Sequence, residues 1–294
     1  MRILHLTDTH IGSVMHVLGG PSGWSREADH LSAMEAALQP ALRGEVDLVV
    51  HSGDLYNRSR PSPKAMRGAT RLLRQVARQV PVVLMPGNHD RRGIKRSLPM
   101  GAPGLHVFDE PAVFRYRGVR LGIMPFRRQP ARWAAEAAAL DCEVLVAHQA
   151  FDGARVPGFT FRVGAQGDTL GKRHLPPRLR WVMCGHIHPR QVTTLGDAQV
   201  VQPGSTERTS FSEADETKGY AVWEFGRQVG FHFVDLPARP MCMARSRAQL
   251  TGLSPGTLVH TDLPPRELVE RGLLVVARRQ RAPRPVSQQA ALFS

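Results

Sequence analysis

Short apolar runs alternate with longer amphipathic segments along the first part of this chain. The apolar runs are four to six residues long and rich in leucine or β-branched residues, which predicts strands. The expected strands are Arg2–Thr7, Asp47–Ser52, Pro81–Met85, Val119–Met124, Glu143–Ala147 and Trp181–Cys184. Helical periodicity fills Arg26–Leu42, Pro63–Gln79 and Pro130–Leu140. Near-continuous apolar strands separated by helices indicate a sheet that is covered on both faces.

After Gly185 the pattern changes to short strands only. These are expected at Gln191–Thr194, Gln199–Gln202, Tyr220–Phe225 and Val229–Leu236. An α/β fold, with sheet packed on sheet and helices outside, accommodates both halves of the pattern. We therefore predict one main domain over residues 1–237. Residues 238–278 then form a small appended segment or remnant cap, and residues 279–294 form a disordered basic tail.

Clusters of Asp, Asn and His stand directly behind the apolar runs. They are Asp8-Thr9-His10, Gly53-Asp54, Gly87-Asn88-His89-Asp90, Ala147-His148 and Gly185-His186-Ile187-His188. Ligands of open α/β sheets bind beyond the carboxyl ends of the strands, where such clusters would converge. An Asp-x-His or a Gly-Asp by itself is common and is usually an ordinary turn. Five clusters in this order are poorly explained as turns, and they hold five of the 13 histidines.

Together the clusters supply eight oxygen or nitrogen donors, too many for one ion of ordinary coordination and suitable for two. Imidazole with carboxylate suits Mn, Fe or Zn rather than Ca, which prefers oxygen ligands. Two ions about 3.5–4 Å apart can clamp the attacking and leaving oxygens of an in-line displacement and lower the pKa of a shared water. Asp54, central in order, is the natural bridging ligand. His89 fits the acid that protonates the leaving oxygen, and Asp90 either orients it or forms a turn hydrogen bond.

The formal net charge of +14 points to a polyanionic partner, nucleic acid above all. Only four of the 39 basic residues are lysine, and such an arginine bias can also reflect GC-rich coding. The placement is more informative, because residues 55–79 contain seven cations and no acid. The cations are Arg58, Arg60, Lys64, Arg67, Arg71, Arg74 and Arg78. A solvated helix face is the alternative, although such faces usually mix charges of both signs.

A second acid-free cluster, Arg91-Arg92-Gly-Ile-Lys95-Arg96, directly follows a predicted ligand motif. Cations in that place could contact a phosphate backbone, which positions nucleic acid without reading its sequence. Arg58, Arg60, Lys64, Arg67, Arg71, Arg91 and Arg92 are therefore candidate nucleic-acid contacts.

As a set, the five clusters resemble the calcineurin-like metallophosphoesterases, over about Met1–Leu236. The resemblance implies a four-layer α/β/β/α sandwich with two packed mixed β-sheets flanked by helices. It implies one metal held by Asp8, His10, Asp54 and His188, and another held by Asp54, Asn88, His148 and His186. His89 would be the catalytic acid. The expected cofactors are two divalent ions, Mn²⁺ first, with Fe²⁺ or Zn²⁺ as alternatives.

Four further segments are similar to the SbcD-type DNA repair nucleases, which are partners of an SbcC-like or Rad-like ATPase. They are Asp54–Pro63, Pro203–Arg208, Phe211–Tyr220 and Leu236–Pro240. Generic phosphatase chemistry does not need them, so they favour the nuclease branch.

The chain also departs from that family. Many relatives carry His or Asp where Asn57 stands, close to the scissile phosphate. Asn57 is thus a candidate nucleic-acid contact, and exonuclease action and its polarity stay open. The 58 residues from 237 to 294 are fewer than the family's capping domain and ATPase-docking helices usually take. They support an ATPase partner only weakly.

The leading functional hypothesis is a two-metal-dependent DNA exonuclease or endonuclease of DNA repair. The alternatives are a small-molecule phosphatase or cyclic-nucleotide phosphodiesterase, and a non-catalytic scaffold, which the complete ligand set disfavours. The three cysteines are too scattered for a disulfide framework, and the first strand carries a candidate ligand by residue 8, unlike a signal peptide. No run approaches the roughly 18–20 apolar residues of a membrane span. We expect a cytoplasmic protein with no membrane partner, and leave a homodimer open.

Overall fold

The computed structural model describes residues 1–19, 24–91, 94–98, 101–159, 162–164 and 167–276. The chain divides into two compact units. The first comprises residues 1–15 and 22–240, and the second comprises residues 16–21 and 241–294.

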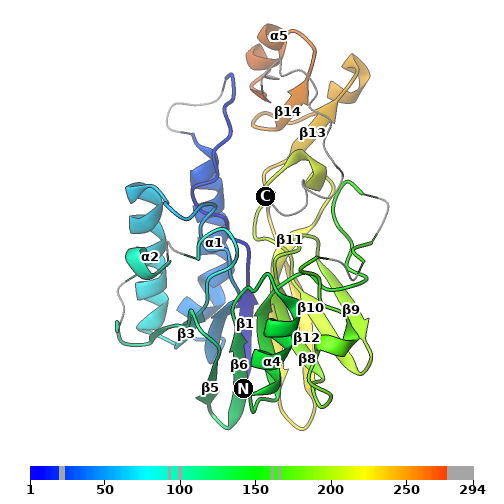
Figure 1. Cartoon of the computed structure of the whole chain (residues 1–294). Coiled ribbons are helices and arrows are strands. Elements are labelled where there is room, and N and C mark those ends of the chain that lie inside the picture. Colours follow the sequence, from blue (N-terminus) through cyan, green and yellow to red (C-terminus); the bar gives the residue numbers. More distant parts are fainter. Residues whose placement is uncertain (20–23, 92–93, 99–100, 160–161, 165–166, 277–294) are drawn as a thin grey trace. The chain divides into compact units, whose positions relative to one another are not determined.

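The described part of the first unit contains two six-stranded sheets (Figure 1). The first sheet has the order β12-β11-β1-β2-β3-β4, with β1 (Arg2–Leu6), β2 (Leu48–His51), β3 (Val82–Leu84), β4 (Leu105–Val107), β11 (Lys218–Phe225) and β12 (Val229–Leu236). The second has the order β5-β6-β7-β8-β10-β9, with β5 (Ala112–Tyr116), β6 (Val119–Met124), β7 (Val144–His148), β8 (Trp181–Gly185), β9 (Gln191–Leu195) and β10 (Ala198–Gln202).

Both sheets are mixed. Strands β1 to β4 are parallel, whereas β11 and β12 add to β1 in antiparallel pairing. In the second sheet β6, β7, β8 and β10 are parallel, and the edge strands β5 and β9 are antiparallel. The parallel strands in the middle of each sheet therefore direct their carboxyl ends to one edge, which is where the predicted clusters lie.

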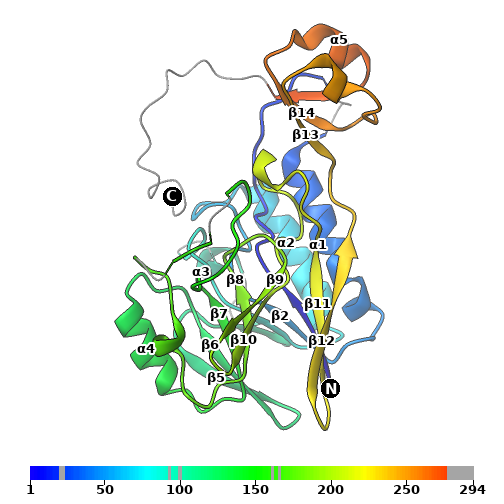
Figure 2. The ribbon, with the colours of Figure 1, turned by 90° about the vertical axis from the view of Figure 1, so that its right-hand side faces the viewer.

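Helices cover the outer faces of the two sheets, with α1 and α2 on one side and α4 on the other (Figure 2). The helices of this unit are α1 (Arg26–Leu42), α2 (Pro63–Ala77), the short α3 (Ile94–Ser97) and α4 (Pro130–Ala138), with 3₁₀ turns η1 (Lys172–His174) and η2 (Phe211–Glu213). The side chains of Ser25 and Ser62 cap α1 and α2 by accepting hydrogen bonds from Ala28 N and Ala65 N. Pro63 begins α2, where its fixed φ is already helical.

Three hydrophobic cores fill the spaces between these layers. On β1, Leu4 and Leu6 pack toward α1 and α2, while Ile3 points the other way, between the two sheets. The core between the sheets also contains Leu48, Val50, Val83, Leu121, Ile123, Val144, Val146, Met183 and Trp223. A third core joins the second sheet to α4 through Trp133. Removing one such large side chain costs about 2–5 kcal/mol, so the layers hold the strand ends in fixed positions.

The predicted α/β fold of two packed mixed sheets with helices outside is confirmed. All the expected strands and helices are present, and their ends differ from the predicted bounds by at most two residues. The strands β4 and β5 and the short helix α3 were not predicted. Strand β4 has only three residues and follows a segment that contains glycine and proline. Its run of apolar residues is therefore too short to indicate a strand.

The second unit has its own small parallel sheet. Strands β13 (Met241–Ala244), β14 (Leu258–Thr261) and β15 (Leu274–Val276) pair in that order, with α5 (Pro265–Glu270) and the turn η3 (Arg247–Leu250) beside them. Its core is formed by Ala244, Leu250, Val259, Leu268, Leu273 and Val275. Leu18 belongs here as well, because its main chain exchanges two hydrogen bonds with Val275, of 2.7 and 3.0 Å. The sequence did not indicate that contribution, and the predicted tail 279–294 lies outside the described residues.

Among the described residues, no helix is both long and apolar enough to cross a lipid bilayer.

Candidate active site

The loops after β1 and β2 run side by side and bring the first predicted residues together. Asp8 N donates to Gly53 O at 3.0 Å, and His10 N donates to Asp54 O at 3.0 Å. The carboxylate of Asp8 in turn accepts hydrogen bonds from His186 N at 3.0 and 3.2 Å. The last contact joins the loop after β1 to the loop after β8, so the ends of the two sheets meet at one site.

Four of the candidate ligands have backbone angles that side chains rarely adopt. The φ values are 50° for Asp8, 44° for His10, 54° for Asp54 and 90° for His186, and the other positive-φ non-glycine residue in the described part of the chain is Arg117. Left-handed φ costs an L-residue about 1–2 kcal/mol. Such strain persists where the surrounding structure over-determines it and tends to gather at functional sites. Here the inter-loop hydrogen bonds hold the strained turns.

Glycine precedes several ligands because there is no room for a side chain. A Cβ on Gly53 would lie 2.3 Å from Nδ1 of His148, and one on Gly87 would lie 2.1 Å from Oδ1 of Asp54. These glycines therefore let the backbone approach the ligands of neighbouring loops closely.

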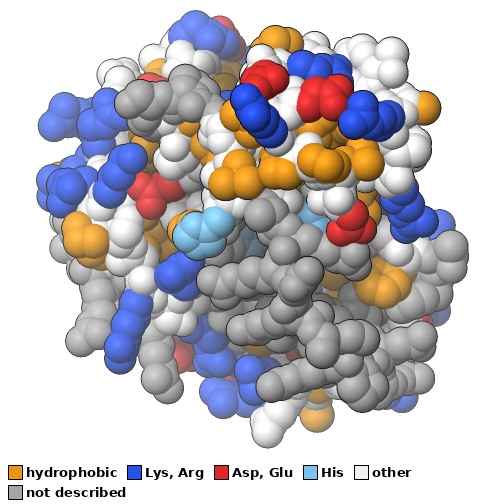
Figure 3. Space-filling model, turned by 90° about the horizontal axis from the view of Figure 1, so that it is seen from above, with side chains coloured by type: hydrophobic (Ala, Val, Ile, Leu, Met, Phe, Trp, Pro, Cys, Tyr) orange, Lys and Arg blue, Asp and Glu red, His pale blue; other side chains and the backbone are white. Residues whose placement is uncertain are grey.

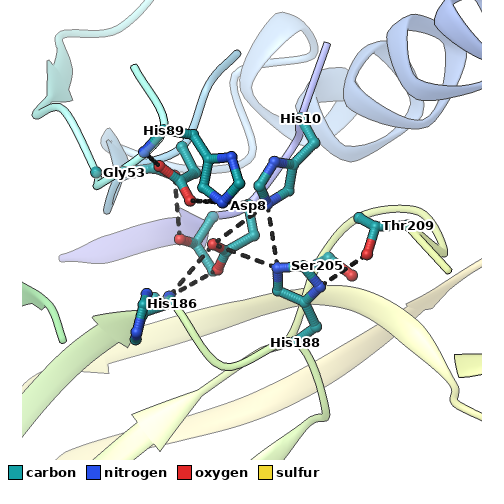
Figure 4. A network of polar contacts seen from close by, with 12 residues as sticks. Asp8, His10, Gly53, His89, His186, His188, Ser205 and Thr209 are labelled. Carbon is teal, nitrogen blue, oxygen red and sulfur yellow. Dashed lines mark hydrogen bonds and ion pairs between the residues drawn. The ribbon is translucent and has the colours of Figure 1, made fainter. Parts of the chain in front are cut away.

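The first set of donors contains Asp8, His10, Asp54 and His188. Nε2 of His10 lies 3.8 Å from Oδ1 of Asp8 and 3.7 Å from Oδ2 of Asp54. Nε2 of His188 lies 3.9 Å from Oδ1 of Asp8 and 3.1 Å from Nε2 of His10. Figure 4 shows the side chains of Asp8, His10 and His188 converging, with His10 above Asp8 and His186 and His188 below it.

The second set contains Asp54, Asn88, His148 and His186. Oδ1 of Asn88 lies 3.1 Å from Nε2 of His148 and 2.9 Å from Nδ1 of His186. Nε2 of His148 lies 3.3 Å from Oδ2 of Asp54, which thus takes part in both sets. Nδ1 of His148 is 2.8 Å from Ser52 O, a contact of the kind that orients a ligand imidazole.

Burial and charge act together at these groups. Burial raises the pKa of Asp8. Burial also disfavours the charged imidazole of His148, but the adjacent Asp54 carboxylate outweighs it and raises the pKa of His148 to about 9. The pKa of Asp54 is correspondingly held below its usual value, since its imidazole neighbours, His148 first, outweigh the effect of burial.

The donor set fits divalent metal ions. Within the part of the chain that the structure describes, three groups of His and Asp side chains have ligand atoms within 4.8 Å of one another, namely Asp8, His10 and His188, then His10, Asp54 and His89, and finally Asp8, Asp54 and His148. Carboxylate and imidazole with one amide oxygen suit Mn, Fe or Zn. The structure therefore brings together all seven side chains that the sequence suggested as ligands, around a shared Asp54.

His89 lies at the open side of this cluster, and its side chain is 31% exposed. Its Nδ1 is 3.1 Å from Asn57 O, its main-chain N donates to Oδ1 of Asp54 at 2.9 Å, and its Nε2 is 3.9 Å from Oδ2 of Asp54. An imidazole held in this way can present Nε2 to a bound substrate.

The predicted orienting contact from Asp90 to His89 was wrong. The carboxylate of Asp90 is fully buried and accepts hydrogen bonds from Gly87 N at 2.9 Å and Tyr56 N at 3.1 Å. Burial, with the nearby Asp54 charge, raises its pKa to about 7. Asp90 therefore shapes the turn that carries Asn88 and His89, which is the second role the sequence suggested, and the Asn57 carbonyl holds the imidazole instead.

The predicted nucleic-acid contacts lie on the surface. Arg58, Arg60, Lys64, Arg67, Arg71 and Arg91 are exposed, Asn57 is half-buried, and Arg92 lies outside the described residues. On α2 the cations face solvent while Ala65, Ala69, Leu72, Leu73 and Val76 are buried. In Figure 3 lysine and arginine side chains are seen on the left-hand side, the side on which α2 lies in Figure 1, and also at the top, right and bottom of the view. The structure leaves these cations unpaired by acids within the described residues.

Sequence reasoning missed two buried charged residues next to the ligands. Glu213 and Lys218 are each 1% exposed, and the carboxylate of Glu213 contacts Nδ1 of His188. Glu213, at the end of the turn η2, and Lys218, at the start of β11, carry no local signal of burial, so only their membership in the Phe211–Tyr220 segment set them apart.

Two carboxylate–imidazole sets that share one aspartate, with a further imidazole at the open side, define the class of metal-dependent phosphoesterases. Residues 1–190 match the family model described as calcineurin-like phosphoesterase, and the chain belongs to this family.

The chain is also similar to proteins named as a nuclease subunit and as DNA double-strand break repair proteins. The chain is 28% identical over 346 residues to the SbcD subunit of the nuclease SbcCD of Rhodobacter capsulatus, covering 99% of this chain and 83% of that protein. It is 29% identical over 241 residues to the DNA double-strand break repair protein Mre11 of Haloferax volcanii, covering 76% of this chain and 49% of that protein. The protein of the same name from Thermoplasma acidophilum is 27% identical over 283 residues, covering 88% of this chain and 68% of its own length. The chain thus spans about half the length of the Haloferax protein.

Proposed function

We propose that this protein is a two-metal phosphodiesterase that hydrolyses the phosphodiester bonds of DNA. The observation that carries the proposal is the convergence of two donor sets on Asp54, with the partly exposed His89 imidazole beside them. The relatives named as a nuclease subunit and as double-strand break repair proteins support DNA as the substrate.

In this proposal Asp8, His10, Asp54 and His188 hold one ion, and Asp54, Asn88, His148 and His186 hold the other, with Mn²⁺ as the expected metal. When bound, the pair supplies Lewis-acid polarisation of the phosphate and activation of water. The contribution of the protein is a rigid frame. Ser52 O orients His148, Gly53 and Gly87 leave space for the ligands, and the turn held by Asp90 carries Asn88.

The chain's own acid is His89. Its Nδ1–H donates to Asn57 O, so the acid form is the imidazolium with a second proton on Nε2, and this second proton passes to the departing oxygen and leaves the neutral ring. The imidazole then regains a proton from solvent, to which it is open. Asp90 has no part in this transfer, because its carboxylate binds two main-chain N–H groups.

The α2 cations and Arg58, Arg60 and Arg91 provide the electrostatic attraction for a phosphate backbone. The relative named as a subunit of SbcCD also supports a second, SbcC-like subunit as a partner. A phosphatase or cyclic-nucleotide phosphodiesterase would use the same donor sets. It would not need the acid-free surface of α2, and this is the observation that favours the nuclease.

One assay separates the two functions. Purified protein with Mn²⁺ is offered labelled single- and double-stranded DNA, and in parallel bis-p-nitrophenyl phosphate and cyclic nucleotides. The proposal expects cleavage of DNA that chelation abolishes, with His89→Ala as the matched inactive control. Turnover of the small esters with intact DNA would remove the nuclease and leave the small-molecule enzyme.

A further inference from the structure

The segment between β10 and β11 contains charged side chains that the metal site itself does not use. Glu213 ends the turn η2, Lys218 begins β11, and both are almost completely buried. Burying one unpaired charge is strongly unfavourable, so a buried carboxylate and ammonium need a specific arrangement around them.

The carboxylate of Glu213 lies behind a candidate ligand. Its Oε1 is 2.9 Å from Nδ1 of His188, and Oγ1 of Thr209 is 3.0 Å from the same nitrogen. The other imidazole nitrogen, Nε2, faces Asp8 and His10. Figure 4 shows His188 between Asp8 and Thr209. The two nitrogens of this ring therefore have separate environments. Nδ1 contacts Glu213 and Thr209, whereas Nε2 faces the proposed metal site.

Lys218 holds the carboxylate in place. Its Nζ donates to Glu213 Oε2 and, at 2.8 Å, to Oγ of Ser205. Thr209 N donates to the same Oε2 at 3.2 Å. Both oxygens of Glu213 are thus engaged, and the ammonium offsets the charge that the carboxylate would otherwise bring next to Asp8.

The segment that carries this pair is itself anchored. Nη2 of the buried Arg26, from α1, donates to Glu207 Oε1 at 3.1 Å. Nε of Arg208 donates to Glu213 O, and its Nη2 donates to Glu216 O, both at 3.1 Å. The η2 turn therefore has little freedom to shift away from His188.

We propose that Glu213, held by Lys218, is a positioning residue that orients His188 as a ligand of one metal ion only. The inference rests on the proposed two-metal site. Of the two donor sets, only the one with Asp8, His10 and Asp54 includes His188. In the other set His148 is oriented by Ser52 O, from a different loop. Partners of this kind typically change metal affinity 10–100-fold when they are removed.

The test is a Mn²⁺ titration of the full chain by calorimetry, with metal content measured after desalting. For Glu213→Gln and Glu213→Leu we expect one of the two Mn²⁺ equivalents to bind about 10–100-fold more weakly while the other is unchanged. Glu213→Gln should lose less, because its amide oxygen can still accept a hydrogen bond from Nδ1. Two equivalents bound as in the wild type would overturn the proposal, and so would equal weakening of both.

Arg127→Met is the control for loss of a buried charged side chain. Arg127 is 5% exposed and pairs with Glu110 and Glu136, neither of which is a candidate metal ligand. We expect lower stability with both Mn²⁺ equivalents retained. If the Glu213 variants do not fold, Thr209→Val removes the milder contact to Nδ1 and should weaken the same single equivalent. If Thr209→Val binds both Mn²⁺ equivalents as tightly as the wild type, the proposal is overturned.

The metal titration needs no substrate. If the wild-type protein binds two Mn²⁺ ions but leaves DNA intact, the nuclease proposal fails and the role of Glu213 is still decided by the variants. If it cleaves DNA and the Glu213 variants keep both ions, only the positioning role fails.

Discussion

Nδ1 of His89 lies 3.1 Å from the main-chain oxygen of Asn57, so the imidazole is held by backbone rather than by a side chain. A carbonyl oxygen can only accept, which makes Nδ1 the donor and leaves Nε2 turned toward Asp54 and the open side of the site. The contact also explains how a residue other than His or Asp can stand at position 57 while the orientation of His89 is preserved.

His89→Ala should lower turnover about 10²–10⁴-fold, because it removes the proton donor for the leaving oxygen. Mn²⁺ binding should stay near that of the wild type, because His89 belongs to neither of the two proposed donor sets. The measurement is kcat on a DNA substrate together with Mn²⁺ stoichiometry. Wild-type kcat would mean that the acid is another group.

Asn57→Ala provides the matched control for that variant. It keeps the main-chain carbonyl and with it the hydrogen bond to His89, so we expect kcat to fall less than about tenfold, below the range for loss of a general acid. A rise in KM for DNA would indicate that the Asn57 side chain contacts the substrate. A loss as large as that of His89→Ala would contradict the backbone role of Asn57.

Metal binding should stabilise the folded chain. A ligand at 100 times its dissociation constant adds about 2.7 kcal/mol per site, and one kcal/mol corresponds to roughly 2–4 °C in Tm for a domain of 150–250 residues. Mn²⁺ should therefore raise Tm by about 5–10 °C for one filled site, and EDTA should reverse the rise. Ca²⁺ should raise it less, since the imidazoles suit it poorly. An unchanged Tm in millimolar Mn²⁺ speaks against the metal site.

Gly87→Ala should lower the affinity for Mn²⁺ while the protein still folds. The new Cβ would lie 2.1 Å from Oδ1 of Asp54, so the shared carboxylate must move. Gly230→Ala on β12 is the control, because nothing lies within 4 Å of a Cβ there. Mn²⁺ titration and circular dichroism of both variants check this. Equal Mn²⁺ affinity in the two variants would show that the site tolerates the displacement.

Neutralising Arg67, Arg71 and Arg74 to glutamine should weaken DNA binding and flatten its salt dependence. Each lost phosphate contact reduces the slope of log K against log salt by about 0.9 for duplex DNA, so three contacts reduce it by up to about 2.7. Arg173, Arg178 and Arg180, exposed on the second sheet's side of the unit, give a control of equal charge. If both triple variants lose binding equally, net charge explains the effect, and α2 is an ordinary solvated face.

Much of the site could be predicted because its signals are local. Each strand shows its own apolar run, and the ligands stand within a few residues of the strand ends, where parallel sheets gather their carboxyl termini. His10 and His188 are 178 residues apart and follow strands of different sheets, and the resemblance to the calcineurin-like family placed them in one ligand set. The complete donor set therefore followed from patterns that are each readable in a short window.

By itself, then, the sequence determined the two-sheet fold and the identity of the residues that meet at its edge. Only the tertiary structure decided which partner each polar group takes. Asp90 accepts hydrogen bonds from main-chain N–H groups, and Glu213 contacts Nδ1 of His188. The main chain of Leu18 pairs with Val275 in the sheet of the second unit. Hydrogen-bond partners depend on distances of a few tenths of an ångström between loops from separate strands. No local pattern of residues encodes those distances, because they are set by how the layers pack.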